Sequence, residues 1–341
     1  MGNKIWIIFI ITFIIGVAGF STWAYLRVPN EDIPPKTEVK ETVNYVSLGD
    51  SIAEGHGLPD YEANKEGYKF VSGSYTNSFK EYLATKYKNV NAINYANSGD
   101  DSTDLLNMLN ALNGASLSAE NQEIKNNLQN ADYITICIGA NDILGPVTDN
   151  LLNFLVYNQD ITSHLDSGIE TFNTNFPKIL SKLQTLNSNA KLIFSSIYNP
   201  YKEFIATQKN ITVSVSGFTS YNVTSSKLNL IGKLSETYID SGNVYNEAGA
   251  VTKTLENGLN QIIENNIKNK NNCYLLDVKD CFDSYYTTNN NYNIVKADIL
   301  SHTTIEVTYN NITSKLFSHL DPHPSELGHT EISKLLNNMV K

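Results

Sequence analysis

The chain is poor in cysteine, proline and basic residues, and each shortage excludes a class of protein. Of its 341 residues only three are cysteine, which are too few and too scattered for a disulfide scaffold or a four-cysteine zinc site. Nine prolines and 19 glycines exclude collagen-like and low-complexity chains. The 25 basic residues are outnumbered by 35 acidic ones, for a formal net charge of −10. Because such a surface repels phosphate backbones, nucleic acid is not an expected partner.

The longest apolar run of the chain lies at its N-terminus. Residues 5–23 read IWIIFIITFIIGVAGFSTW, and no charged residue falls between Lys4 and Arg27. About 20 apolar residues cross a bilayer as a helix, and this run is apolar on every face, which disfavours an ordinary core helix. We therefore expect residues 1–27 to form a single-pass N-terminal membrane anchor.

A removable signal peptide is the alternative to a retained anchor. The small residues 17–19 offer a cleavage site, although the bulky Phe20 that follows disfavours it. In both cases the positive-inside bias keeps Lys4 in the cytoplasm and places the remainder of the chain outside. The expected location is the cell membrane, with the main domain outside, or the secreted fraction if the segment is cleaved.

Residues 28–42 read as a polar linker, and residues 43–341 as one domain. Short runs rich in β-branched and aromatic residues predict strands buried on both faces, as in a parallel sheet; these runs are 44–48, 90–96, 133–138, 192–197 and 274–278. Apolar stripes with helical spacing lie between them. This alternation predicts an α/β fold of three layers, a doubly wound sheet of about five parallel strands. Two polar stretches, 55–76 and 199–251, are expected to be loops or small insertions.

The three cysteines carry separate expectations. Cys273 and Cys281 lie eight residues apart, so outside the cytoplasm they have the chance to pair if their geometry allows it. Cys137 lies in an apolar run and is predicted to be a small buried hydrophobic residue.

Polar residues suited to acyl transfer follow the predicted strands. Ser51 comes after the first strand, Gly99 after the second and Asn141 after the third, while His323 precedes the last helix. Because functional groups of an open parallel sheet collect beyond the carboxyl ends of its strands, we expect these four residues to meet. A serine hydroxyl becomes a nucleophile when a neighbouring base takes its proton, and imidazole is such a base near neutral pH.

The tetrahedral intermediate of acyl transfer carries an oxyanion, which needs donors fixed in place. The backbone N–H groups of Ser51 and Gly99 and the side-chain amide of Asn141 are groups of the right kind. Gly99 also permits close approach of a substrate, because it has no Cβ.

Four sequence blocks in order resemble the SGNH (GDSL-type) hydrolase superfamily. They are SLGDSIAEG around Ser51, NYANSGDDS around Gly99, IGANDIL around Asn141 and DPHPSELGH around His323. The resemblance runs from about residue 43 to the C-terminus and implies a flavodoxin-like fold. It implies Ser51 as the nucleophile, His323 as the base, and Ser51, Gly99 and Asn141 as the oxyanion hole. It also implies hydrolysis of esters or thioesters with no metal and no cofactor.

One position departs from the pattern of that superfamily. An aspartate usually stands three residues before the histidine, and here that position is Leu320. Asp321, two residues before His323, is the candidate third member of the catalytic triad, holding the histidine tautomer. Alternatively, a backbone carbonyl takes this part and Asp321 only helps to cap the last helix.

Further polar residues near the blocks carry lesser expectations. Asp50 and Asp142 are expected to tie down their turns by accepting hydrogen bonds from backbone N–H groups. His56 follows Ser51 closely, in a predicted loop, and is either a surface residue or part of the substrate entrance.

The expected function is that of an extracytoplasmic serine ester hydrolase acting on a small-molecule, lipid or acylated-glycan ester. A metal-dependent phosphoesterase is one alternative, because Asp50, Asn141, Asp142, Asp321 and His323 are groups that bind metals. The order of these residues argues against it, since such enzymes usually open with an Asp-x-His pair on the first strand. A surface binding module that has lost turnover is the other alternative. The sequence does not set the oligomeric state.

Overall fold

The computed structural model describes residues 41–64, 67–114, 116–145, 161–202, 211–214, 220–223, 225–246, 250–289, 306–309, 312–315 and 322–340. All of them fall within one unit, residues 41–341. The apolar run 5–23 lies outside the described residues. Among the helices that are described, none has both the length and the apolar character needed to cross a membrane.

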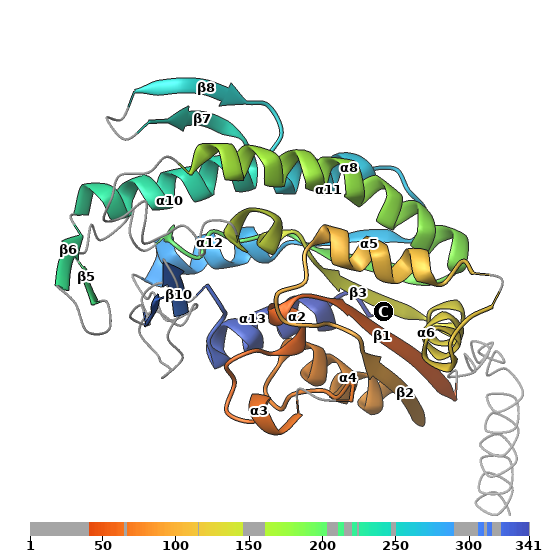
Figure 1. Cartoon of the computed structure of the whole chain (residues 1–341). Coiled ribbons are helices and arrows are strands. Elements are labelled where there is room, and N and C mark those ends of the chain that lie inside the picture. Colours follow the sequence, from red (N-terminus) through yellow and green to blue (C-terminus); the bar gives the residue numbers. More distant parts are fainter. Residues whose placement is uncertain are drawn as a thin grey trace, which may run out of the picture. The chain divides into compact units, whose positions relative to one another are not determined.

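A five-stranded parallel sheet lies at the centre of the described chain (Figure 1). From edge to edge its strands are β2 (Asn89–Asn94), β1 (Thr42–Gly49), β3 (Tyr133–Cys137), β4 (Lys191–Ser195) and β9 (Cys273–Leu276). Each coincides with a predicted apolar run, so the prediction of an α/β fold with about five parallel strands is confirmed. This order, with the first strand between the second and third, is that of flavodoxin-like folds, whose ligands bind where the order reverses, beyond β1 and β3.

The register of the sheet brings the ends of β1 and β3 to the same level. Leu48 pairs with Ile136, and Gly49 pairs with Cys137, the last residue of β3. The segments that leave these two strands therefore start side by side, and they carry two of the predicted site residues, Ser51 and Asn141.

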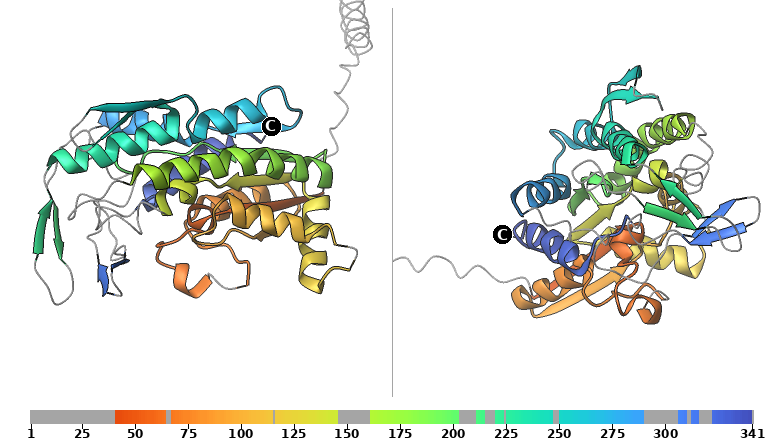
Figure 2. Two further views of the ribbon diagram at one scale, coloured as in Figure 1. Left: turned by 45° about the horizontal axis from the view of Figure 1, so that its top comes forward. Right: turned by 90° about the vertical axis from the view of Figure 1, so that its left-hand side faces the viewer.

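Helices form a layer on each face of the sheet (Figure 2). The first layer consists of α5 (Ser102–Ala111), α6 (Ala119–Asn130), α8 (Thr162–Leu186), α10 (Ser225–Asp240) and α11 (Leu259–Ile267). The second consists of α2 (Ser51–Glu54), α4 (Tyr75–Lys86), α12 (Val278–Asn289) and α13 (Glu326–Asn337). A further short helix, α3 (Tyr61–Asn64), lies between α2 and α4 in the sequence.

Alternate residues of a strand belong to two separate hydrophobic cores, one on each face of the sheet. In β3, Ile134 and Ile136 pack with the first layer, whereas Tyr133 and Cys137 pack with the second. This division follows from the two-residue period of a strand, which sends successive side chains to opposite faces. Because both faces are covered, the strands read as continuous apolar runs in the sequence.

Stretch 199–251 contains more regular structure than expected. Besides α10, it holds two antiparallel pairs, β5 (Ile211–Ser214) with β6 (Ser220–Val223), and β7 (Gly242–Tyr245) with β8 (Val251–Leu255). The expectation of loops or small insertions is wrong for α10, since Ile231, Leu234 and Tyr238 are buried in the first core. Their spacing of three and four residues is the signal of an amphipathic helix, which the surrounding Asn, Ser and Thr residues obscured. A third antiparallel pair joins β10 (Glu306–Tyr309) to β11 (Ile312–Lys315).

The three cysteines are free thiols, so Cys273 and Cys281 do not pair. Cys137 is buried in the second core, as predicted.

Candidate active site

Ser51 is the first residue of a single helical turn, α2, that follows β1. Asp50 caps this turn, and its Oδ1 accepts a hydrogen bond from the Ile52 N–H at 3.0 Å, as predicted for this residue. Gly49, just before the cap, has a φ of +144°, and a Cβ here would lie 2.2 Å from the carbonyl oxygen of the last residue of β3. Only glycine therefore allows so sharp a turn beside β3. Since the first N–H groups of a helix lack an acceptor within it, Ser51 presents its hydroxyl and its N–H together.

His323 meets Ser51 although 272 residues separate them, with its Nε2 lying 2.8 Å from the Ser51 Oγ. The chain is held on both sides of the histidine. Before it, the Tyr198 hydroxyl donates a hydrogen bond to the Pro322 carbonyl at 2.5 Å. After it, Ser325 caps α13, its Oγ accepting the Gly328 N–H. The imidazole is thus placed to take the serine proton.

Gly99 lies in a tight turn beyond β2. The Asp100 N–H donates to the Asn97 carbonyl at 3.2 Å, and the Asn97 N–H donates to the Gly49 carbonyl at 3.0 Å. Gly99 occupies the third position of the turn with a φ of +91°, a conformation that a type II turn requires there. A Cβ at Gly99 would meet no atom within 4 Å, so this side of the turn faces open space.

Asn141 lies in the helical residues 140–145 that follow β3. Its Nδ2 donates a hydrogen bond to the Asp100 carbonyl at 2.9 Å, and the amide carries a second N–H. Because Asp100 follows Gly99, this bond joins the segment of Asn141 to the turn of Gly99. The contacts therefore join Ser51 to His323 and Asn141 to the turn of Gly99, while the bond from Asn97 to Gly49 holds that turn beside the end of β1.

Asp142 ties two elements together rather than only its own turn. Its Oδ2 accepts the Ser102 N–H at 2.9 Å, and its Oδ1 accepts the Ser102 hydroxyl at 2.5 Å. Ser102 begins α5, so the carboxyl fixes the start of this helix against residues 140–145. The expectation that Asp142 serves its own turn missed this longer connection, which the sequence does not reveal.

Buried carboxyl groups lie close beneath the site. Desolvation raises the pKa of Asp50 to about 7, with the nearby Asp100 adding to the effect and the Ile52 N–H opposing it. Desolvation likewise raises the pKa of Asp142 to about 7, against hydrogen bonds from Ser102 that lower it. Burial raises the pKa of the Cys137 thiol well above its usual value, which keeps that thiol protonated and unreactive.

His56 packs directly on the histidine of the site. Its ring centroid lies 4.5 Å from that of His323 at an interplanar angle of 35°, and 4.6 Å from that of Tyr61. The sequence placed His56 in a loop that either lies at the surface or lines the entrance. In the structure His56 lies in the turn after α2, partly exposed, and its ring forms a wall against the imidazole; its part in the substrate entrance stays a prediction.

Glu54 is a buried acidic residue of the site that the sequence analysis missed. Its side chain is 6% exposed, and its Oε2 accepts hydrogen bonds from the N–H and the hydroxyl of Ser98 and from the Tyr61 hydroxyl. The available signal was its position three residues after Ser51, which on a helix gives the same face.

A family model described as the GDSL-like lipase/acylhydrolase family matches residues 47–330. The chain belongs to this family. The description of this family names lipases and acylhydrolases, and the sequence resemblance is confirmed.

One curated relative shares part of its sequence with this chain. The chain is 30% identical over 166 residues to the uncharacterized protein YpmR of Bacillus subtilis (strain 168), across 49% of this chain and 55% of YpmR. The chain thus spans about half the length of this relative.

Solved structures share the fold of the hydrolase. The lipase Lip_vut3 from a goat rumen metagenome gives a TM-score of 0.50 at 16% identity, over 87% of this chain and 96% of its own. Phospholipase A1 from Streptomyces albidoflavus NA297 gives 0.51 at 14% identity, over 87% and 98% of the two chains.

Within the described part of the chain, no three His, Cys, Asp or Glu side chains are grouped closely enough to hold a metal ion. Both carboxylate oxygens of Asp142 are already engaged by Ser102, and Asp50 is buried beneath α2. Asp321 lies outside the described residues, so its predicted part in the triad stays a prediction.

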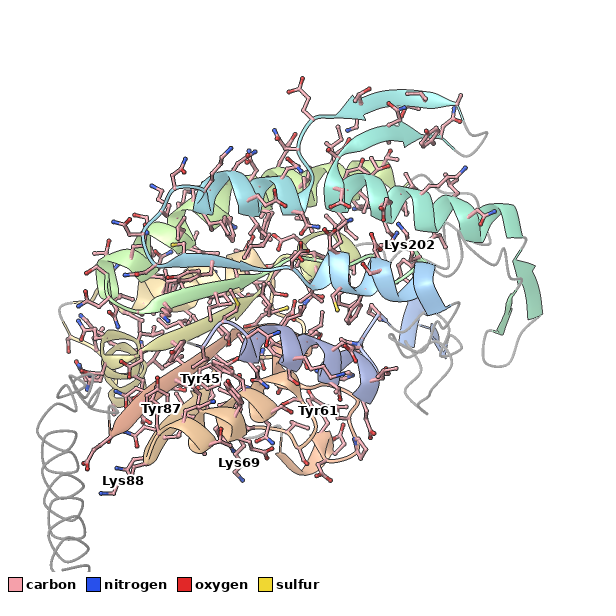
Figure 3. All side chains as sticks on the ribbon, turned by 180° about the vertical axis from the view of Figure 1, so that it is seen from behind. Tyr45, Tyr61, Lys69, Tyr87, Lys88 and Lys202 are labelled. Carbon is pink, nitrogen blue, oxygen red and sulfur yellow. The ribbon has the colours of Figure 1, made fainter. Side chains whose placement is uncertain are left out.

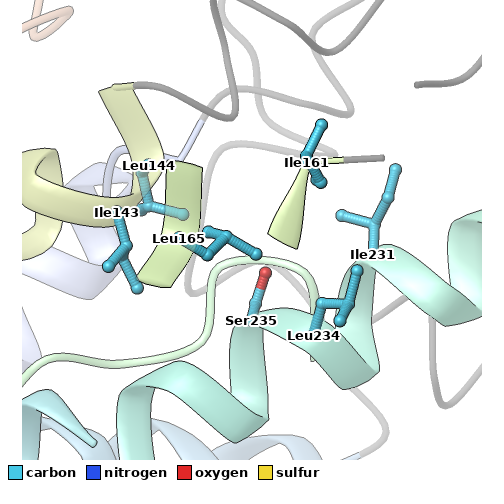
Figure 4. Close-up of a pocket in the computed structure, with 7 residues that line it drawn as sticks. All are labelled: Ile143, Leu144, Ile161, Leu165, Ile231, Leu234 and Ser235. Atoms are coloured by element: carbon cyan, nitrogen blue, oxygen red, sulfur yellow. The ribbon is translucent and has the colours of Figure 1, made fainter. Parts of the chain in front are cut away.

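A small apolar cavity lies among the elements that follow Asn141 (Figure 4). Its accessible volume is about 10 Å³, and its lining residues are Ile143, Leu144, Ile161, Leu165, Ile231, Leu234 and Ser235. This volume suits about one water molecule, so the cavity has no room for an acyl chain.

Proposed function

We propose that this protein is a serine ester hydrolase in which Ser51 attacks the carbonyl carbon of an acyl or acetyl ester. The contact of 2.8 Å between His323 Nε2 and Ser51 Oγ is the observation that carries the proposal, because it is the contact a general base needs. His323 takes the serine proton during attack and returns it to the leaving alcohol. Water then releases the acyl group from Ser51 by the same steps in reverse order.

The oxyanion of each tetrahedral intermediate would be stabilised by three donors. These are the N–H groups of Ser51 and Gly99 and the side-chain amide of Asn141. The connected contacts of the turn and of residues 140–145 support this arrangement, since donors fixed before the reaction stabilise developing charge without reorganisation.

Asp321 is our proposed third member of the triad, orienting His323 through Nδ1. The alternative is a backbone carbonyl in the same part; capping of α13 already falls to Ser325. Asp321→Asn decides between them. A triad aspartate predicts a loss of kcat of about 10⁴-fold, whereas a backbone carbonyl predicts a kcat close to that of the wild type.

The proposed substrates are of two classes, lipid or short-chain acyl esters and O-acetyl groups on a glycan. Both present the ester carbonyl that Ser51 would attack. Comparing kcat/KM on p-nitrophenyl esters of increasing acyl length with acetate release from an acetylated xylan separates the two classes.

We also propose a membrane-anchored location outside the cytoplasm, on the strength of the apolar run 5–23 and the preceding Lys4. An anchored protein remains in the membrane fraction after alkaline carbonate and is released by detergent. If the main domain lies outside the cell, an impermeant fluorophosphonate should label Ser51 in intact cells. Recovery of a shortened protein in the medium would favour the secreted form instead.

Ser51→Ala tests the proposed reaction, with Ser118→Ala as its control. Ser118 caps α6 on the exposed side of the first layer, so its replacement removes a hydroxyl without touching the site. We expect Ser51→Ala to lower ester hydrolysis by about 10⁴-fold or more while unfolding at the same temperature as the wild type. Hydrolysis that persists in Ser51→Ala, or that is abolished by a chelator, would favour the metal-dependent alternative.

A further inference from the structure

Two of the proposed oxyanion donors come from different segments of the chain. The Ser51 N–H belongs to α2, and the Gly99 N–H belongs to the turn of residues 97–100. A hydrolase needs both donors aimed at one oxygen atom, and a misplacement of about 1 Å can cost about 10²-fold in rate. The bond from the Asn97 N–H to the Gly49 carbonyl holds the first residue of the turn beside the end of β1, and a contact between α2 and the residue next to Gly99 would align the two donors further.

Glu54 supplies such a contact. It is the last residue of α2 and stands one helical turn from Ser51. Its Oε2 accepts the Ser98 N–H at 2.8 Å and also accepts the Ser98 hydroxyl, and Ser98 directly precedes Gly99. The carboxylate thus binds the backbone of the turn at the residue next to the donor.

The same oxygen extends the contact toward the base. Oε2 accepts the Tyr61 hydroxyl at 3.0 Å, and Tyr61 comes from α3 (Figure 3). The ring of Tyr61 packs on His56, which packs on His323. Ser98 Oγ lies 3.4 Å from His56 Nδ1 as well. One buried oxygen of Glu54 therefore binds both the turn at Ser98 and Tyr61, which in turn packs on His56 beside the imidazole.

We propose that Glu54 is a positioning residue, which fixes the Ser98–Gly99 turn relative to Ser51 and so assembles the oxyanion hole. This inference rests on the proposed serine mechanism. Glu54 itself touches no reacting atom. Its negative charge would oppose the oxyanion, so the benefit lies in acceptor geometry rather than in charge.

The distinction between geometry and charge makes the proposal testable through two variants. The hydrogen bonds from the Ser98 N–H, the Ser98 hydroxyl and the Tyr61 hydroxyl all go to one oxygen, and the amide oxygen of Glu54→Gln is able to accept all three without a charge. Glu54→Ala removes the acceptor altogether. Asp240→Ala is the control, because Asp240 is a partly buried carboxylate away from the site that accepts a side-chain amide N–H from Asn260 at 2.8 Å and pairs with Lys279 at 3.1 Å.

For Glu54→Ala in the full chain we expect kcat on a p-nitrophenyl ester to fall by about 10²-fold with KM nearly unchanged. Affinity for a boronic acid, which adds to the serine hydroxyl as a tetrahedral anion, should fall by a similar factor. Glu54→Gln should restore kcat to within about 3-fold of the wild type. Asp240→Ala should lower the unfolding temperature without changing kcat.

Three results would overturn the proposal. The first is a Glu54→Ala variant with wild-type kcat. The second is a Glu54→Gln variant as slow as Glu54→Ala, which would assign the effect to charge. The third is a loss of kcat in Glu54→Ala that matches its loss of folded protein, with unchanged boronic acid affinity. If instead Ser51→Ala still hydrolyses the ester, the serine mechanism fails, and that outcome is separate from any result at Glu54.

Discussion

Asp50→Asn should change how the stability of this protein depends on pH. The carboxyl of Asp50 is fully buried, and desolvation raises its pKa from 3.8 to about 7. In the folded state the group therefore holds a proton between these values, whereas in the unfolded chain it does not. Stability from this group is fully present below about pH 4 and is lost as the pH rises through about 7.

The size of this effect follows from the two pKa values. Between the two pKa values, the free energy of unfolding changes by about 1.4 kcal/mol per pH unit for one proton. The free energy of unfolding of the wild type should therefore fall by about 3 kcal/mol relative to that of Asp50→Asn between about pH 4.5 and about pH 8. The amide of the variant keeps an oxygen that can accept the Ile52 N–H, so the cap of α2 is preserved. Its buried NH₂ adds a cost of about 1–3 kcal/mol, which is independent of pH.

Urea unfolding of both proteins across this pH range measures the difference directly. Other carboxyl groups with raised pKa values, Asp142 among them, contribute equally to both proteins and cancel. We expect the stability of Asp50→Asn relative to the wild type to rise steadily and to level off above about pH 7. A difference that stays constant with pH would show that Asp50 is ionised throughout, and that burial does not control its protonation.

Three further substitutions test the placement of the site. Gly99→Ala should cost about 1–2 kcal/mol of stability because of its positive φ and should lower kcat by about 10²-fold, since the methyl group enters the open space beside the proposed donor; wild-type kcat would place the substrate elsewhere. Tyr198→Phe removes the bond to the Pro322 carbonyl and should cost about 1 kcal/mol in urea unfolding with a measurable fall in kcat, and an unchanged kcat would mean that this bond does not position His323. Gly168→Ala would place a Cβ 1.9 Å from the Asp142 carbonyl oxygen, so α8 must shift and unfolding free energy should fall by about 1–3 kcal/mol; a variant as stable as the wild type would contradict the close approach of α8.

The strands were predictable because burial on both faces removes polar residues from them. The run 133–138 is the clearest case, since every residue of β3 is buried. Once the strands are placed, the rule that parallel strands present their carboxyl ends at one edge brings together the residues that follow them. This is why Ser51, Gly99 and Asn141 could be expected at one edge of the sheet; His323 precedes α13 instead, and it was expected there because the four sequence blocks occur together in order.

Contacts made by side chains across long sequence distances were not predictable in this way. Glu54 binds Ser98 across 44 residues, and Tyr198 binds the Pro322 carbonyl across 124. Periodicity reports which face of an element is buried, but it does not report which polar group a buried acceptor meets. Helix α10 was missed for a related reason, because its buried residues lie three and four apart within a polar stretch that also resembles a loop.

The two hydrophobic cores divide the proposed machinery between them. Ile52 of α2 and Ile332 of α13 pack in the second core, so the proposed nucleophile and the proposed base adjoin one helical layer. Leu105 of α5 and Ile143, two residues after Asn141, pack in the first core, so the proposed oxyanion donors beyond Ser51 adjoin the other layer.

Substitutions that loosen one helical layer are expected to impair a different step of catalysis from those that loosen the other. Loosening the second layer should disturb the contact between Ser51 and His323, and with it the rate at which a phosphonate labels the serine. Loosening the first layer should leave that contact in place and weaken only the stabilisation of the oxyanion. The bond from Glu54 to Ser98 crosses from α2 to the turn of Gly99 and is one of the contacts that link the two halves. Substitutions in the two cores are therefore expected to lower the catalytic rate through different steps, unless a substitution touches a crossing contact and affects both steps.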